Sequence, residues 1–135
     1  SGPMLDRIDI HVEMGEVGYN DIAGRSCGEP SSAIRARVNA ARAIQTRRYA
    51  CMGILFNAQL TNRMISQCCV LTSDAESLMK KAFAALKLSA RAYTRLLKVS
   101  RTIADLAGSE QIKAEHIAEA IQYRSLESKY WGEIK

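Results

Sequence analysis

The chain has 135 residues and a formal net charge of +5, and 47% of its residues are hydrophobic. This length and apolar content are enough for one compact core. No apolar run approaches the length of a membrane span and no signal-peptide pattern is present, so we expect no membrane partner.

The charge is distributed unevenly along the chain. Residues 1–30 hold two basic and six acidic residues, whereas residues 31–135 hold 17 basic and eight acidic residues. We place a domain boundary in the glycine-rich loop where the sign changes. The basic part suits nucleic acid or nucleotide phosphates, although a solvated basic face explains the same charge. The four cysteines and two histidines lack metal-ligand spacing, which predicts no metal site and reduced thiols.

Residues 8–14 alternate strictly between apolar and polar side chains. The apolar set is Ile8, Ile10, Val12 and Met14. This period predicts a β-strand with one buried face, and it places His11 on the polar surface. Since a single strand cannot satisfy its own backbone, we expect its sheet partners outside this sequence or in another chain.

Residues 32–49 read as a helix capped by Ser31 or Ser32. The spacing of Ile34, Val38 and Ala41 predicts its buried side. The five arginines of this stretch have no acidic residue within the helix. Two interpretations stay open for them, a contact face for nucleic acid or another subunit, and a solvated basic face.

Three further helices are predicted after residues 32–49, besides the helix over 89–107 described below. A short one begins at Thr61 or Asn62. The next runs over 73–87 and opens with a capping box, in which Ser73 and Glu76 satisfy first-turn N–H groups. The last covers about 114–124, with His116 as a surface residue in its first turn. Residues 125–135 form a tail.

The helix over 89–107 is marked most clearly. Ser89 is a good N-cap and Gly108 suits the position just past the C-terminus. Its buried stripe is predicted to comprise Tyr93, Leu96, Leu97, Ile103 and Ala104. Arg91, Arg95 and Lys98 follow at i, i+4 and i+7 and define a second, basic ridge.

Arg91 lies in the first turn of this helix, where the helix dipole disfavours a cation. An arginine beside free N–H groups makes an anion site, which is the functional interpretation. A solvated arginine that costs a few tenths of a kcal/mol is the alternative.

Together these elements predict a mainly α fold, in which residues 31–124 form a bundle of four main helices preceded by one orphan strand. No G-x-x-x-x-G-K-[ST] loop, nucleophile set or carboxylate pair appears. The chain therefore shows no catalytic apparatus of its own. Its candidate functional groups are arginines, which stabilise phosphate charge in phosphoryl transfer: Arg7 before the strand and Arg91.

Four stretches of the sequence resemble the ComM (YifB) family of magnesium-chelatase-like AAA+ ATPases. They are S-G-P-M-L-D-R-I-D-I-H-V-E at 1–13, G-E-P-S-S-A-I-R-A-R-V at 28–38, L-S-A-R-A-Y-T-R-L-L-K-V-S-R-T-I-A-D-L at 88–106 and E-H-I-A-E-A-I-Q-Y-R-S-L at 115–126. The resemblance implies that residues 1–30 are the last strand and connecting loop of an AAA+ core. It implies that 31–124 are the helical lid, and that the phosphate-binding loop and acidic magnesium motif precede Ser1.

The resemblance also implies roles for individual residues. Arg7 matches the arginine finger that reaches a neighbouring subunit's nucleotide, and Arg91 matches the sensor-2 arginine at the γ-phosphate, with Arg95 beside it on the nucleotide. The intact protein is then a cytoplasmic hexamer that uses ATP and Mg²⁺ and acts on DNA as a branch-migration helicase in competence or recombination. No cofactor is expected on this piece alone, which should be inactive.

Two other functions stay open from the sequence. One is the ATPase subunit of a metal chelatase, which would drive metal insertion through a partner. The other is a stand-alone helical module that binds nucleic acid through the 32–49 face.

Overall fold

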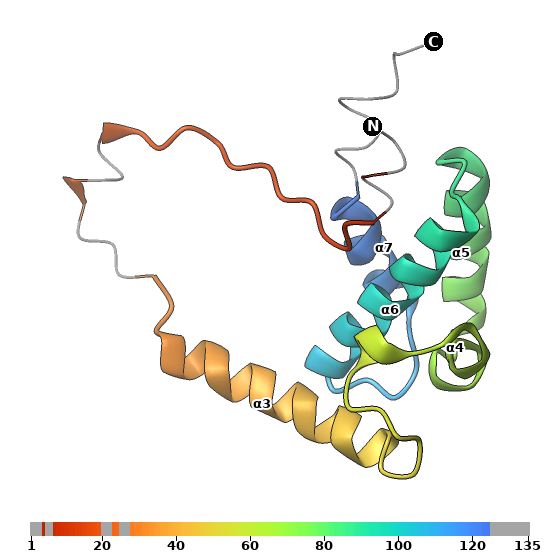
Figure 1. The fold of residues 1–135 in the computed structure, drawn as a ribbon. Coiled ribbons are helices and arrows are strands. Elements are labelled where there is room, and N and C mark those ends of the chain that lie inside the picture. Colours follow the sequence, from red (N-terminus) through yellow and green to blue (C-terminus); the bar gives the residue numbers. More distant parts are fainter. Residues whose placement is uncertain (1–3, 5–6, 20–22, 25–27, 125–135) are drawn as a thin grey trace.

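The computed structural model describes residues 4, 7–19, 23–24 and 28–124. Its elements are α3 (Ser31–Arg48), the 3₁₀ turn η1 (Asn57–Gln59), α4 (Asn62–Cys68), α5 (Ser73–Ala85), α6 (Ala90–Leu106) and α7 (Ala114–Gln122) (Figure 1). Within these residues no sheet forms, and one isolated parallel bridge joins Leu71 to Ile112. The predicted mainly α class is confirmed. The predicted tail at 125–135 lies outside the described residues.

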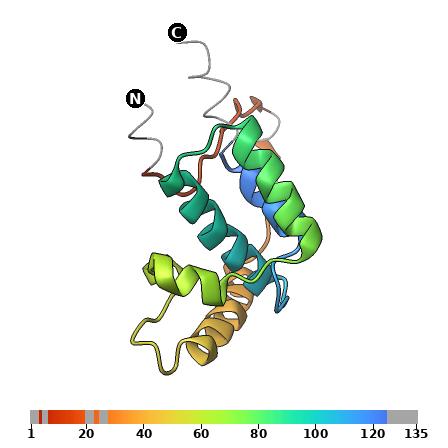
Figure 2. The same ribbon diagram turned by 90° about the vertical axis from the view of Figure 1, so that its right-hand side faces the viewer.

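Helix α6 is the central element of the bundle. It packs against α7, α3, η1 and α4, while α5 packs against α7 (Figure 2). Leu96, Leu97, Ile103 and Ala104 are buried on it, as their spacing predicts. Burying each large apolar side chain contributes roughly 1.5–3 kcal/mol, so this helix anchors the core.

Both ends of α6 have the predicted caps. The Ser89 hydroxyl accepts a hydrogen bond from the Ala92 N–H at 3.1 Å. Gly108 has a φ of +67°, and the Ser109 N–H donates to the Ala104 carbonyl at 2.8 Å. This 6→1 bond past a left-handed glycine is a Schellman motif, and it satisfies a carbonyl that the helix leaves open.

Two predicted helix starts are capped differently, and a third is as predicted. The N-cap of α5 is Thr72, whose hydroxyl accepts from the Ala75 N–H at 3.4 Å, so the capping box predicted for Ser73 is wrong by one position. Helix α3 already includes Ser31, and Pro30 precedes it without a side-chain cap. Proline's fixed φ lets the helix begin there without a capping hydroxyl. Helix α4 follows Thr61, as predicted.

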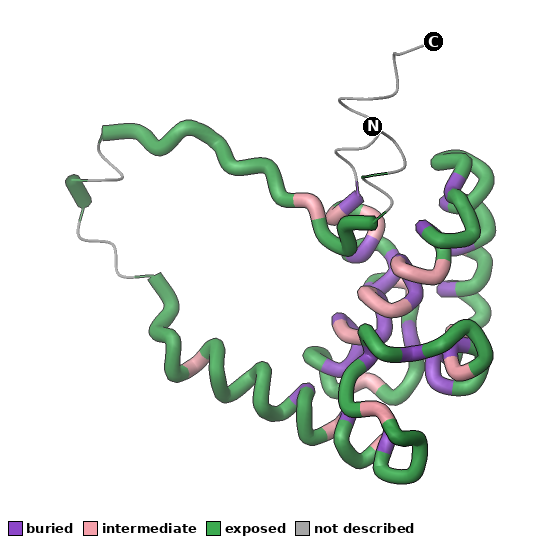
Figure 3. The backbone as a smooth tube through the Cα atoms, in the orientation of Figure 1, coloured by how far each residue is buried: buried purple, intermediate pink, exposed green. Residues whose placement is uncertain are grey.

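The predicted buried stripes are buried only where another helix covers them. Ile34 and Val38 are 43% and 44% exposed, because the N-terminal half of α3 extends beyond the bundle (Figure 3). Phe83 lies at core spacing in the 73–87 helix, which predicts that it is buried, yet it is 44% exposed. Tyr93 is also exposed, and its ring meets that of Phe83 edge to face at 5.9 Å. These two rings cover each other at the edge of the core.

The strand predicted for residues 8–14 does not form. This segment runs without regular structure, and its four apolar side chains are exposed. A strand needs a neighbouring strand for its N–H and C=O groups, and the described part of the chain offers none. One backbone bond holds the segment to the bundle, from the His11 N–H to the Tyr123 carbonyl at 2.8 Å. His11 is half-buried there rather than on the surface.

His116 is a core residue and not the surface residue predicted. It is 3% exposed, and its Nδ1 accepts from the Lys113 N–H at 3.0 Å. The imidazole thus takes the part that Glu or Gln plays in a capping box, at the third position of α7. An aromatic ring in this role fills core volume as well as capping the helix.

Candidate functional site: a cationic groove along helix α6

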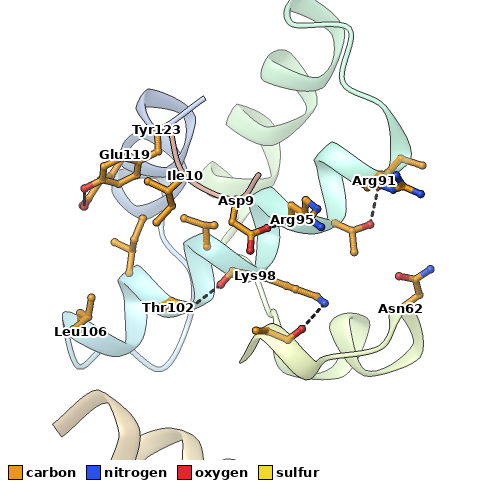
Figure 4. Close-up of a pocket in the computed structure, with 15 residues that line it drawn as sticks. Asp9, Ile10, Asn62, Arg91, Arg95, Lys98, Thr102, Leu106, Glu119 and Tyr123 are labelled. Atoms are coloured by element: carbon orange, nitrogen blue, oxygen red, sulfur yellow. Dashed lines mark hydrogen bonds and ion pairs between the residues drawn. The ribbon is translucent and has the colours of Figure 1, made fainter. Parts of the chain in front are cut away.

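A groove of about 720 Å³ runs along the exposed side of α6. One wall is formed by the predicted basic ridge, because Arg91, Arg95 and Lys98 all line it. In Figure 4 these side chains follow one another along the N-terminal part of the helix. The structure therefore brings together the three cations that the i, i+4, i+7 spacing selects, in a space large enough for a small organic ligand.

Arg91 has its guanidinium free for a ligand. It is exposed, and it forms no ion pair within the described residues. It stands at the second position of α6, close to the backbone N–H groups that the helix leaves unpaired. Guanidinium and N–H donors at the positive end of a helix dipole together favour an anion at this place.

The other two cations of the ridge already have partners. Arg95 forms an ion pair with Asp9, which comes from the unstructured N-terminal segment. Lys98 donates from Nζ to the Ala58 carbonyl at 3.0 Å. An incoming anion can displace both partners from these cations. The Asp9 side chain is 55% exposed, so its ion pair with Arg95 is weak, and the Ala58 carbonyl carries no net charge.

The opposite end of the groove has a different character. It is lined by Ile103, Leu106, Ile10 and Tyr123, with Glu119 at its edge. Figure 4 shows Leu106 at the far end of α6 from Arg91. A ligand that fits the whole groove is thus anionic at one end and apolar or aromatic at the other.

Arg7, the second predicted site residue, does not belong to this groove. It lies in the N-terminal segment, is exposed and is not among the residues that line the groove. Its backbone N–H donates to the Met4 carbonyl at 3.0 Å. Whatever Arg7 contacts, it does so separately from Arg91.

A buried ionic cluster, which the sequence pattern does not predict, is centred on Asp105. Asp105 is 2% exposed and accepts from Arg48 of α3, from Arg101 one turn earlier in α6, and from the Asn57 amide of η1. The contacts to Oδ2 from Arg48 and Asn57 are both 2.9 Å. One carboxylate thereby joins three elements of the bundle. The i, i+4 spacing of Arg101 and Asp105 is the signal that could have identified it.

The cluster keeps two arginines charged in the interior. Hydrogen bonding to Asp105 raises the pKa of Arg48 above its ordinary value, whereas burial lowers the pKa of Arg101. Arg101 is also held by the carbonyls of Ser109 and Glu110, at 2.6 Å and 2.7 Å. An arginine retains its charge under these conditions, so the cluster is a structural anchor of the bundle.

No helix within the described residues is long and apolar enough to cross a membrane. The same residues contain no group of three or more His, Cys, Asp and Glu side chains that could hold a metal ion. Cys68 and Cys69 are buried free thiols, as predicted, and Cys51 is an exposed one. Cys27 lies outside the described residues.

Comparison with known proteins identifies the family of the helical part of the chain. The family model for the C-terminal part of magnesium chelatase subunit ChlI matches residues 28–124. The chain therefore belongs to the magnesium chelatase ChlI C-terminal family.

The individual relatives agree with the resemblance seen in the sequence. The chain is 40% identical over 127 residues to the competence protein ComM of Haemophilus influenzae, covering 93% of this chain and 24% of the relative. It is 39% identical over 128 residues to the uncharacterized protein YifB of Salmonella typhimurium, covering 94% and 24%. The similarity to the ComM/YifB proteins is confirmed. The chain spans about a quarter of the length of these relatives.

Proposed function

We propose that this chain is the helical lid of a ComM/YifB-type AAA+ ATPase and that its groove contacts the phosphates of ATP. The observation that carries the proposal is Arg91, an exposed arginine without an ion-pair partner in the described structure, at the start of a helix and beside Arg95 and Lys98. Membership of the magnesium chelatase ChlI C-terminal family supports it.

Arg91 acts in this proposal as the sensor-2 residue. Its planar guanidinium suits bidentate contact with the γ-phosphate, and it sits where a helix dipole already attracts negative charge. Arg95 supports it one turn further along, once the ligand replaces the exposed Asp9 carboxylate. The hydrolytic step itself needs a phosphate cradle, which the sequence of this chain lacks.

Mg²⁺ is assigned to the remainder of a longer protein. The donors that Mg²⁺ prefers are carboxylates with water and phosphate oxygens. The groove instead presents three cations, and no acidic cluster for a metal occurs among the described residues. This chain's part in the reaction is to bind and orient phosphate charge.

Arg7 is proposed to act on a neighbouring subunit's nucleotide as an arginine finger. Its exposure and its separation from the groove suit a residue that works across an interface. The subunits would form a hexameric ring that moves DNA, as a branch-migration helicase of competence or recombination. The name of the Haemophilus relative, competence protein ComM, supports this assignment.

A second candidate is the ATPase subunit of a metal chelatase, which the description of the matching family favours. DNA distinguishes the two candidates. We expect the longer protein to hydrolyse ATP faster when DNA is added, and the 135-residue chain to hydrolyse none. Unstimulated ATPase activity would favour the chelatase, and turnover by the chain alone, free of contaminating ATPase, would contradict both.

The role of Arg7 is tested by mixing subunits of the longer protein. Arg7→Ala subunits keep their own nucleotide site, so they should regain activity beside subunits that cannot bind ATP but retain Arg7. Failure of every mixture to recover activity would show that Arg7 does not act across the interface.

A further inference from the structure

Helix α3 carries five arginines and no acidic residue, and the structure separates them by their partners. Arg48 is committed to Asp105 in the buried cluster, and Arg37 forms an ion pair with Glu29. The other three are exposed and have no carboxylate partner among the described residues: Arg35, Arg42 and Arg47.

Two of these arginines share one side of the helix with an amide. Arg35, Asn39 and Arg42 follow at i, i+4 and i+7, so their side chains form one ridge, with the arginines about 10 Å apart along the axis. The helix packs on the bundle through a different side, where Ala41 and Gln45 are buried. The ridge therefore lies on a different side of α3 from the one that packs on the core. Arg35 belongs to the N-terminal half of the helix, which extends beyond the bundle (Figures 1 and 3). Arg42 belongs to the half nearer the bundle, where it contacts Phe56.

Arg42 is held in position before any partner arrives. Its guanidinium carbon lies 3.8 Å from the centroid of the Phe56 ring, a cation–π contact. This contact uses the face of the guanidinium and leaves its edge donors available. A side chain already fixed in this way loses less conformational entropy on binding.

We propose that the ridge Arg35–Asn39–Arg42 is a docking surface for the phosphate backbone of a nucleic acid. The ridge offers two guanidinium groups and an amide NH₂ as donors, and the helix carries no carboxylate to repel a polyanion. Such contacts position a backbone without reading its sequence. The surface lies outside the groove of Arg91 and does not depend on the proposed contact with ATP.

The test measures binding of the 135-residue chain to a fluorescein-labelled 20-base-pair duplex of mixed sequence over a range of KCl concentrations. The wild type should bind weakly, with an affinity that falls steeply as salt rises. In R35A/R42A two phosphate contacts are lost, so the slope of log K against log salt should shrink by about 2, and the affinity at 0.1 M salt by about tenfold or more. R35K/R42K should keep most of the slope.

The matched control is R63A/K81A, which removes the same charge from two exposed positions on α4 and α5. We expect it to leave the slope nearly unchanged. Equal losses in both double variants would show that net charge alone drives binding, and this would overturn the proposal. So would an R35A/R42A chain that binds the duplex like wild type but no longer associates with a second copy in sedimentation, because the ridge would then be a subunit contact.

The outcome is separable from the proposed ATPase role. In the longer protein R35A/R42A should leave ATP hydrolysis without DNA at the wild-type rate, whereas variants of Arg91 should lower it. A ridge that fails the duplex test thus says nothing against the groove, and a groove that fails says nothing against the ridge.

Discussion

Asp105 shows how much of the bundle depends on a single side chain. It is buried between two arginines that come from different helices, and it is the shared acceptor for both. Moving such charges out of water is costly, and the Asp105 carboxylate supplies the only counter-charge within the cluster that offsets that loss. The effect of removing it is therefore much larger than that of an exposed salt bridge.

We predict that Asp105→Asn lowers the free energy of unfolding by about 3 kcal/mol or more, because buried Arg101 and half-buried Arg48 then lack a counter-charge. Urea denaturation of the chain measures this. The control Asp74→Asn changes an exposed carboxylate in the first turn of α5 and should cost less than about 1 kcal/mol. Similar losses in the two variants would contradict the structural role of the cluster.

Cys69 provides a pH-dependent prediction. Burial raises the pKa of its thiol to about 11, from an ordinary value near 9. The folded state therefore holds this proton more tightly than the unfolded chain does. The contribution of the protonated thiol to the free energy of unfolding is lost as the pH rises from about 9 to about 11.

The burial of Cys69 also predicts its chemical reactivity. At pH 8 iodoacetamide should alkylate exposed Cys51 and spare Cys69, as peptide mass spectrometry can show. Equal labelling of both would contradict the burial.

At the scale of whole elements, the sequence predicts the features that depend only on neighbouring residues, such as helix caps. The start and end of α6 follow from Ser89 and Gly108, since caps are formed within a few residues. The strand at 8–14 could not be judged in this way, because alternation predicts a strand only when a partner strand exists. The same limit explains Ile34 and Val38, whose spacing marks an apolar face but not what covers it.

The Schellman motif at the end of α6 leads to a prediction about backbone strain, in which the substitution removes no side-chain contact. Gly108→Ala should lower the free energy of unfolding by about 1 kcal/mol, because a residue with Cβ is strained at a φ of +67°. A Cβ there meets no atom within 4 Å, so steric clash plays no part. Gly28→Ala is the matched control, with equally open space but no left-handed backbone, and should change stability by less than about 0.5 kcal/mol. Thermal unfolding compares the two, and equal effects would exclude backbone strain as the cause.

The same distinction between local and long-range features applies to the candidate site. The ridge of Arg91, Arg95 and Lys98 follows from helical spacing, and the groove confirms that the three lie together. The Asp9 partner of Arg95 comes from a distant part of the sequence, and no local pattern indicates it. The burial of Arg101 is not predicted for a related reason: arginine is normally exposed, and the i, i+4 spacing indicates its pairing with Asp105 but not that other elements cover the pair.

In the molecule as a whole, α6 has two roles divided along its length. Its C-terminal half is fixed in the core by Asp105 and by the Schellman motif, whereas its N-terminal half presents Arg91 to the groove. A helix that is packed in the core along its length holds an exposed side chain at a defined place. We expect that Arg91 can be changed without loss of the fold, since it is exposed and has no ion-pair partner among the described residues.

The central claim is that Arg91 contacts the phosphates of ATP, and the ATPase rate of the longer protein carrying Arg91→Ala tests it most directly. We predict a fall of roughly 10³-fold, the scale seen when a phosphate-contacting arginine is removed. The same change at exposed Arg47 should leave the DNA-independent rate unaltered, and circular dichroism should show that both variants are folded. An Arg91→Ala protein that hydrolyses ATP like the wild type, or that loses activity only because it unfolds, would contradict the account.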